Sequence, residues 1–187
     1  YGDHRDLHLS LRRQRQMCIR DRFTPKLDDR FGEGRITSRI GLDRDCDIFT
    51  SDDDLYVWTA HEHQRESVSC VLVDEAQFLS PKQVLQLTLV VDKLKIPVLC
   101  YGLRTDFRGE PFPGSAYLLA WSDEMTEIKT ICKSGKKATM NARLDEEGNR
   151  VTEGDQISIG LNYEAQARDV FELDKVSPIG YQIPEAN

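Results

Sequence analysis

The clearest pattern of apolar and polar positions lies between Val68 and Leu79, which reads V-S-C-V-L-V-D-E-A-Q-F-L. Its first six residues are apolar and rich in valine, which predicts a buried strand over 68–73. The strand ends abruptly at Asp74 and Glu75. Ligands of open α/β sheets bind outside the carboxyl ends of the strands. The pattern therefore predicts two carboxylates at a ligand-binding edge. An Asp that caps a turn beside a surface Glu would give the same sequence pattern.

A helix is predicted on each side of this strand. Residues 51–54, S-D-D-D, supply an N-cap and an acidic first turn for a helix through about Arg65. Ser80 as N-cap and Pro81 at the first helical position open a second helix. Its apolar positions recur at helical spacing: Val84, Leu87, Val91 and Leu94. Residues 96–101 form the next strand, and this succession predicts a parallel βαβ unit.

The pattern changes in the second half of the chain. A loop over 102–114 leads into a short helix around 118–121. Beyond Thr126, short alternating segments at 128–132, 138–144 and 156–160 are separated by Gly-containing turns, which is typical of β-hairpins.

The predicted fold class is α/β with a small β-hairpin appendage. Four parts are expected: a foreign or disordered segment 1–22, a truncated α/β nucleotide-binding domain 23–125, the β appendage with a lasso loop 126–175, and a tail 176–187.

Composition narrows the possible functions. The chain has 187 residues, 39% of them hydrophobic and 30% charged, with a net charge of -7. No apolar run approaches the roughly 20 residues that cross a bilayer, so no membrane partner is expected. The negative charge argues against a nucleic-acid partner, which needs a basic surface. Five scattered cysteines indicate reduced, intracellular usage, and a cytoplasmic location is expected.

The first 22 residues differ from the rest of the chain. They contain six Arg against three Asp. The stretch Q-M-C-I-R-D-R resembles a translated sequencing-library adapter, which would make the segment a fusion scar. The alternative is a natural basic tail, with Leu7, Leu11 and Ile19 on one side of a frayed helix.

Three long motifs carry a family resemblance. They are D-D-R-F-G-E-G-R-I-T-S-R-I-G-L from Asp28, C-V-L-V-D-E-A-Q-F-L from Cys70, and I-P-V-L-C-Y-G-L-R-T-D-F-R-G-E-P-F-P-G-S from Ile96. Over roughly residues 23–172 the chain resembles type II, cellular-type thymidine kinases of proteobacteria. The resemblance implies a P-loop NTPase (RecA-like) parallel sheet, here incomplete at its N-terminus. It also implies transfer of the ATP γ-phosphate to the 5′-hydroxyl of thymidine.

The resemblance also implies roles for individual residues. Glu75 matches the proton acceptor and Arg30 a catalytic arginine at the phosphates. Asp74 and Asp28 match positions near Mg²⁺. The ATP segment is Asp74, Glu75, Ala76 and Gln77. The thymidine contacts are Phe78, Leu103, Phe107 and Tyr163. Without the resemblance, Phe78, Leu103 and Phe107 would be interpreted as core residues, and Arg30 as part of a surface ion pair.

The chain departs from the family pattern in three places. It contains no Gly-Lys-Ser or Gly-Lys-Thr, the end of the P-loop that cradles a triphosphate, so the chain as written is expected to be inactive. Of four soft zinc ligands in the appendage only one survives, so zinc is not expected. The four matching positions are Cys132, Ser134, Asp169 and Glu172. The lasso I-G-L-N-Y-E-A from Ile159 lacks the family's double glycine.

Two other functions remain open. D-E-A-Q also occurs in RNA helicases, but that class needs further motifs and usually a second RecA-like domain. A non-catalytic nucleoside-binding module would keep the pocket and lose the phosphate site. The family resemblance further implies a homotetramer as the oligomeric state.

Overall fold

The computed structural model describes residues 19–26, 35–37, 43–156, 163–176 and 178–180. The chain forms two compact units, Tyr1–Gly102 and Leu103–Asn187. The boundary that the sequence predicted, between residues 125 and 126, falls inside the second unit. In the described part of the chain, no helix is both long and apolar enough to span a membrane.

The first unit is built on a four-stranded sheet in the order β4-β1-β5-β6. The strands are β1 (Ile19–Pro25), β4 (Asp47–Phe49), β5 (Val68–Val73) and β6 (Val98–Cys100). All three neighbouring pairs are parallel. The predicted α/β class, the strand over 68–73 and the parallel βαβ unit are confirmed. The strand β1 begins at Ile19, ahead of the predicted domain start at Phe23.

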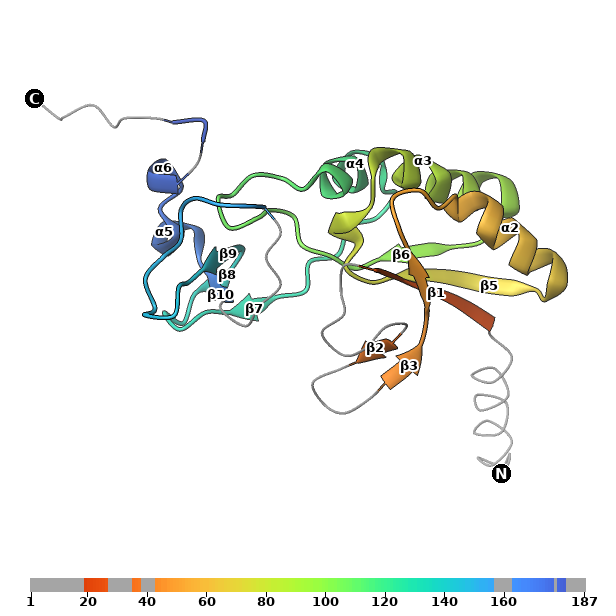
Figure 1. Cartoon of the computed structure of the whole chain (residues 1–187), viewed down its shortest axis with the longest axis horizontal. Coiled ribbons are helices and arrows are strands. Elements are labelled where there is room, and N and C mark those ends of the chain that lie inside the picture. The colour runs from red at the N-terminus through yellow and green to blue at the C-terminus, as the bar shows by residue number, and fades with distance from the viewer. Residues whose placement is uncertain (1–18, 27–34, 38–42, 157–162, 177, 181–187) are drawn as a thin grey trace, which may run out of the picture. The chain divides into compact units, whose positions relative to one another are not determined.

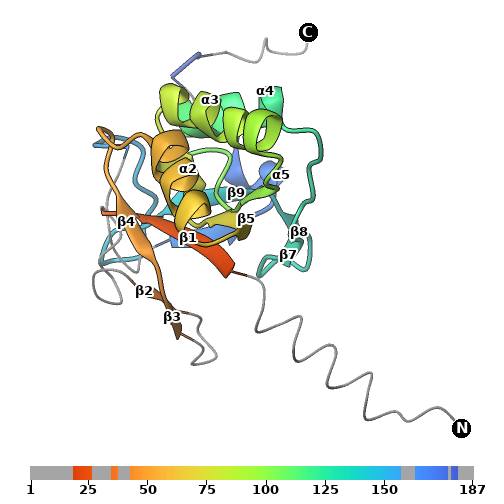
Figure 2. The ribbon, with the colours of Figure 1, turned by 90° about the vertical axis from the view of Figure 1, so that its right-hand side faces the viewer.

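Two helices pack together over one face of this sheet, α2 (Leu55–Arg65) and α3 (Pro81–Leu89) (Figures 1 and 2). On that face Phe23, Val71 and Val73 are fully buried. The Phe23 ring meets Trp58 of α2 edge-on, with ring centroids 5.3 Å apart. The core of the first unit therefore lies between β1, β5 and the two helices.

The helix starts follow from capping chemistry. Asp54 caps α2, because its carboxylate accepts the backbone N–H groups of Tyr56 and Val57. Of the predicted S-D-D-D stretch, Asp53 instead closes a turn on Thr50. Ser80 caps α3 in a full capping box with Gln83, and a π-helical turn, Val90–Leu94, continues this helix.

A small antiparallel hairpin, β2 (Arg35–Thr37) with β3 (Asp43–Asp45), completes the described elements of the first unit. In the second unit, helix α4 (Pro113–Trp121) begins earlier than the sequence predicted. The reason is that Pro113 sits at its first position, where the missing N–H costs nothing.

The β part of the second unit contains two antiparallel pairs. They are β7 (Thr130–Ile131) with β8 (Lys137–Ala138), and β9 (Met140–Arg143) with β10 (Tyr163–Gln166). Two single-turn helices follow, α5 (Arg168–Phe171) and α6 (Leu173–Val176). Met140, Ala142, Phe171 and Val176 form their small core. The predicted pairing of 128–132 with 138–144 is confirmed by β7 and β8. Of the predicted strand 156–160, residues 157–160 lie outside the described residues. The strand that pairs with β9 is 163–166, where the sequence predicted part of a loop.

Candidate active site at the carboxyl edge of the sheet

Asp74 and Glu75 lie directly after β5, at the carboxyl edge of the sheet. The backbone N–H of Asp74 donates to the carbonyl of Phe23 on β1, at 3.0 Å. On the other side, the N–H of Ala76 donates to the carbonyl of Tyr101, just beyond β6, at 2.8 Å. The pair is therefore held between the ends of two neighbouring strands, as the sequence pattern predicted.

Glu75 adopts a left-handed backbone conformation, with φ 48° and ψ 40°. A residue with a Cβ pays roughly 1–2 kcal/mol for this conformation, and such residues cluster at functional sites. Its N–H donates to a carboxylate oxygen of Asp74 at 3.0 Å. The left-handed residue turns the chain sharply from the strand into the 3-10 turn Ala76–Phe78.

The Glu75 carboxylate is held by a buried amide. Nε2 of Gln77 donates to Oε2 of Glu75 at 2.5 Å, and Gln77 is only 2% exposed. Since Gln77 is fixed by its burial, it fixes the carboxylate in turn. The structure thus brings together Asp74, Glu75, Ala76, Gln77 and Phe78 within one strand end and one turn.

Gly102 makes this turn possible, and the sequence did not single it out. A Cβ at this position would lie 2.7 Å from Oε1 of Gln77 and 2.9 Å from its backbone nitrogen. The backbone after β6 therefore passes too close to the 3-10 turn for any side chain. The signal available in the sequence was the glycine at the first position after a predicted buried strand.

The electrostatic setting of the edge is acidic. Burial, together with the charges of Asp47 and Asp74, raises the pKa of the Cys46 thiol to about 11. Arg22 of β1 opposes this shift. A polyphosphate at this edge would therefore need positively charged groups or ions beside it in addition to backbone donors.

The remaining predicted site residues lie elsewhere. Asp28 and Arg30 fall outside the described residues. Leu103, Phe107 and Tyr163 belong to the second unit, where Leu103 is 42% and Tyr163 is 39% exposed. Phe107, in contrast, is 1% exposed, as a core residue would be.

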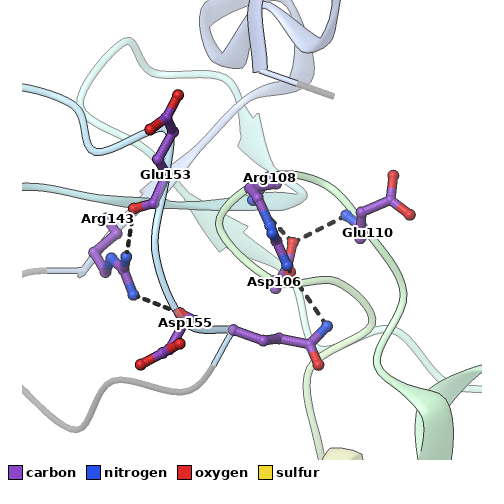
Figure 3. Close-up of polar contacts among 7 residues, drawn as sticks. Asp106, Arg108, Glu110, Arg143, Glu153 and Asp155 are labelled. Atoms are coloured by element: carbon purple, nitrogen blue, oxygen red, sulfur yellow. Dashed lines mark hydrogen bonds and ion pairs between the residues drawn. The ribbon is translucent and has the colours of Figure 1, made fainter. Parts of the chain in front are cut away.

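Asp106 organises the loop that carries Phe107 (Figure 3). Its side chain is fully buried, and one carboxylate oxygen accepts the backbone N–H groups of Arg108 and Glu110 at 2.9 and 3.0 Å. The other oxygen accepts from the Arg108 guanidinium, with the closest nitrogen at 3.1 Å. Gly109, at φ 84°, closes the turn. A buried carboxylate with this many donors stiffens the whole loop.

The Phe107 ring is covered by an arginine that the sequence did not indicate. The guanidinium carbon of Arg143 lies 3.8 Å from the ring centroid. The same guanidinium donates to the carbonyls of Asp155 and Glu153 at 2.9 and 3.0 Å (Figure 3). An arginine at the end of a predicted strand carries no distinctive pattern, so only the coordinates reveal this role.

The four positions matched to zinc ligands do not form one cluster. The Cys132 thiol and the Ser134 hydroxyl are 2.9 Å apart, and this hydrogen bond is the largest cause of a lowered Cys132 pKa. Asp169 instead forms an ion pair with Lys136. Glu172 accepts from Lys175 at 2.6 Å. Over the described ranges, no group of three or more His, Cys, Asp or Glu residues could hold a metal ion.

Known proteins provide an independent comparison. The family model described as thymidine kinase matches residues 8–171, and so includes part of the segment predicted to be foreign. The thymidine kinase of Shewanella oneidensis is 55% identical over 151 residues, covering 80% of this chain and 79% of the relative. That of Vibrio cholerae is 58% identical over 140 residues, covering 75% and 73%. That of Legionella pneumophila is 57% identical over 141 residues, covering 75% and 68%.

Proposed function

Since this chain belongs to the thymidine kinase family, we propose that Glu75 is the base of an ATP-dependent phosphorylation of thymidine that yields dTMP. The observation that carries the assignment is the left-handed Glu75, which the buried Gln77 holds at the carboxyl edge of the sheet. A strained, locked carboxylate at a ligand-binding edge is what a positioned proton acceptor requires.

The chemistry follows from this arrangement. The 5′-hydroxyl of thymidine attacks the γ-phosphorus of ATP, and its proton passes to the Glu75 carboxylate. The bond from the γ-phosphorus to the β-γ bridging oxygen breaks, and ADP leaves. Gln77 keeps the carboxylate oriented through the reaction, so that the acceptor is in place when the hydroxyl loses its proton.

Asp74 fits a Mg²⁺ site. A hard carboxylate at this edge, in an acidic setting, suits a cation that prefers oxygen ligands. Mg²⁺ usually takes one or two protein carboxylates and completes its shell with water and phosphate oxygens, which agrees with the small number of acidic ligands described at this edge. Bound there, the ion would neutralise charge on the transferring phosphate. We assign Asp28 to the same site, and Arg30 to the transferring phosphate.

By family resemblance, we assign the thymidine contacts to Phe78, Leu103, Phe107 and Tyr163. Leu103 and Tyr163 are exposed enough to contact a ligand, whereas the buried Phe107 would support the site from below the surface. ATP contacts are assigned to residues 74–77. A cytoplasmic location and a homotetramer complete the proposal by family resemblance, and the altered ligand set argues that the appendage folds without zinc.

We further propose that these 187 residues by themselves bind thymidine without phosphorylating it. They include no Gly-Lys-Ser or Gly-Lys-Thr to cradle the triphosphate. The sheet offers a place for a further helix: Leu72 and Leu99 pair on the face opposite α2 and α3, and Leu99 is 42% exposed. Parallel sheets are usually covered on both faces.

Calorimetry distinguishes this function from its alternatives. Thymidine should bind the chain and uridine should bind more weakly, whereas an RNA helicase would show RNA-stimulated ATP hydrolysis and no thymidine binding. Absence of thymidine binding would contradict the proposal. In a chain that also carries a P-loop segment, Glu75→Gln should lower kcat by about 10² or more, the usual worth of a general base. The exposed carboxylate Asp92, in the turn after α3, provides a matched control as Asp92→Asn.

A further inference from the structure

We infer that Arg143 is a positioning residue for the nucleoside, because it clamps the turn 153–156 onto the ring of Phe107. The inference rests on the proposed function, in which the loop that carries the buried Phe107 belongs to the thymine site. All of the groups involved belong to the second unit. None of them was indicated by the sequence pattern except Phe107.

The first half of the clamp is the guanidinium of Arg143 itself. Its carbon lies 3.8 Å from the Phe107 ring centroid, close enough for a cation–π contact. Its two terminal nitrogens donate to the carbonyls of Glu153 and Asp155. The planar guanidinium thus contacts the ring with its face and donates to two backbone carbonyls with its edge. A lysine ammonium could not do both.

Gly154 lets the turn reach this guanidinium. It lies between the two acceptor carbonyls at φ +119°, a conformation that residues with a side chain rarely adopt. A Cβ there would lie 2.7 Å from a terminal nitrogen of Arg143. The turn and the arginine therefore fit only because this position is glycine.

The second half of the clamp comes from the loop that carries Phe107. Nε2 of Gln156 donates to the buried Asp106 carboxylate at 3.2 Å. Asp106 is 3% exposed and immediately precedes Phe107 in the chain. The turn 153–156 is thus held at two points. Its carbonyls bind Arg143, which lies on the face of the Phe107 ring, and its Gln156 binds Asp106, the residue before Phe107.

This arrangement has a direct consequence for binding. The position of the Phe107 ring is set by Arg143 and Asp106. Since this ring is buried and Arg143 covers its face, the clamp would act on the nucleoside by fixing the loop that carries Phe107. Loosening the clamp should weaken nucleoside binding without removing any group that touches the nucleoside. Thymidine affinity should therefore respond to Arg143 and to Gly154, and the affinity for ATP with Mg²⁺ should not.

The test uses two independent ways of opening the clamp. Arg143→Met removes the donors and the cation, and Gly154→Ala leaves Arg143 in place but pushes the turn away from it. Gly148→Ala is the matched control, since Gly148 also has a positive φ, +85°, but a Cβ there would meet nothing within 4 Å. Thymidine titration gives the affinity, and hydrogen exchange of the free chain reports the amides of 151–156.

Arg143→Met and Gly154→Ala should each raise the Kd for thymidine about tenfold, the worth of one hydrogen-bonded charged contact. Both should speed exchange over 151–156, and the double variant should be no worse than either single one because both open the same clamp. Arg143→Lys should recover part of the loss. Gly148→Ala introduces a similar backbone strain but touches neither Arg143 nor the turn 153–156, so its thymidine Kd should stay within about twofold of wild type.

Three outcomes would overturn the inference. Unchanged exchange in Arg143→Met would mean that there is no clamp. Faster exchange with unchanged thymidine affinity would mean that the clamp does not position the nucleoside, and an equal loss in Gly148→Ala would mean general destabilisation. A wild-type chain that binds no thymidine would instead overturn the proposed function, and with it the role assigned to the clamp; this failure is recognised because it appears before any substitution.

Discussion

Asp21 is the residue that fits its surroundings least well. It lies on β1 in the middle of the sheet and is 9% exposed. One of its carboxylate oxygens is buried without a hydrogen-bond partner among the described residues. Burial and the charges of Asp47 and Glu62, partly offset by His63, raise its pKa to about 6. An unpaired carboxylate costs free energy at such a position, because strands of parallel sheets are usually apolar on both faces.

Replacing Asp21 should therefore stabilise the chain. Its folded pKa of about 6 lies above the ordinary value of 3.8, so the folded state holds the proton more tightly than the unfolded state. The free energy of unfolding should fall as the pH rises from about 4 through about 6. Asp21→Val should raise it at pH 7 by about 2 kcal/mol and flatten this pH dependence. Urea unfolding between pH 4 and pH 8 measures both effects. The control is the exposed Asp52→Val, and an equal gain there would contradict the argument.

At Glu75, unlike at Asp21, the unfavourable feature belongs to a residue with a proposed function. Its left-handed backbone is unfavourable for any residue with a Cβ but not for glycine. Glu75→Gly and Glu75→Ala both remove the carboxylate and its hydrogen bond to Gln77. Glu75→Gly should nevertheless be more stable than Glu75→Ala by about 1 kcal/mol. Urea midpoints of the two variants provide the measurement, and equal midpoints would show that the turn relaxes when the side chain is lost.

At the scale of elements, buried glutamines connect the two helices of the first unit. Nε2 of Gln83 donates to the carbonyls of Thr50 and Asp53 ahead of α2, at 2.7 and 3.2 Å. Oε1 of Gln86 accepts the first backbone N–H of α2, from Leu55, at 3.1 Å. These contacts satisfy backbone groups that a helix start leaves without partners. They also explain why polar side chains occupy the buried side of α3.

Gln83→Leu tests this connection. Leucine keeps most of the volume but removes the Gln83 partner of the Asp53 carbonyl and of the Ser80 N–H. The Thr50 carbonyl keeps only the N–H of Asp53, at 3.3 Å. The variant should lose roughly 2–4 kcal/mol in the free energy of unfolding, because unsatisfied buried groups cost about 1–3 kcal/mol each. The exposed Gln64→Leu on α2 should change it by less than about 0.5 kcal/mol. Similar losses in the two variants would show that the glutamine contacts are not the cause.

These contacts also mark the limit of what the sequence pattern could predict. Strand β5, the Ser80 cap and the parallel βαβ unit were predictable because each depends on neighbours in the sequence. The buried stripe of α3 was placed at Val84, Leu87 and Val91, but Val90 rather than Val91 is fully buried. The stripe is shifted because Gln83 and Gln86 belong to it, and their partners lie over thirty residues away.

The same distinction applies to the candidate site. The carboxylates after β5 were predictable, since a strand end is a local feature. Gly102 and Arg143 were not, because their importance comes from groups brought close only by the fold. The backbone strain at Glu75 also depends on this packing.

At the scale of the whole molecule, the residues proposed to act on the phosphate belong to the first unit, and most of those proposed for the nucleoside belong to the second. The first holds Asp74, Glu75 and Gln77, and the second holds Phe107 with its clamp. A substitution in one unit should therefore affect mainly one ligand. This division gives the proposed function a test that does not depend on turnover: thymidine binding can persist where phosphate transfer fails.

The missing phosphate cradle provides the decisive comparison. The 187-residue chain should bind thymidine but form no dTMP from ATP, because backbone N–H groups and a lysine of a P-loop are needed to hold the triphosphate. The same chain with residues 1–18, ahead of β1, replaced by a strand, a G-x-x-x-x-G-K-[ST] loop and a helix should form dTMP. Changing that loop's lysine to methionine is the matched control and should abolish the gain. Phosphorylation by the 187 residues alone would mean that another cation holds the triphosphate. Binding without turnover in the extended chain would show that Glu75 and Asp74 do not complete a kinase site.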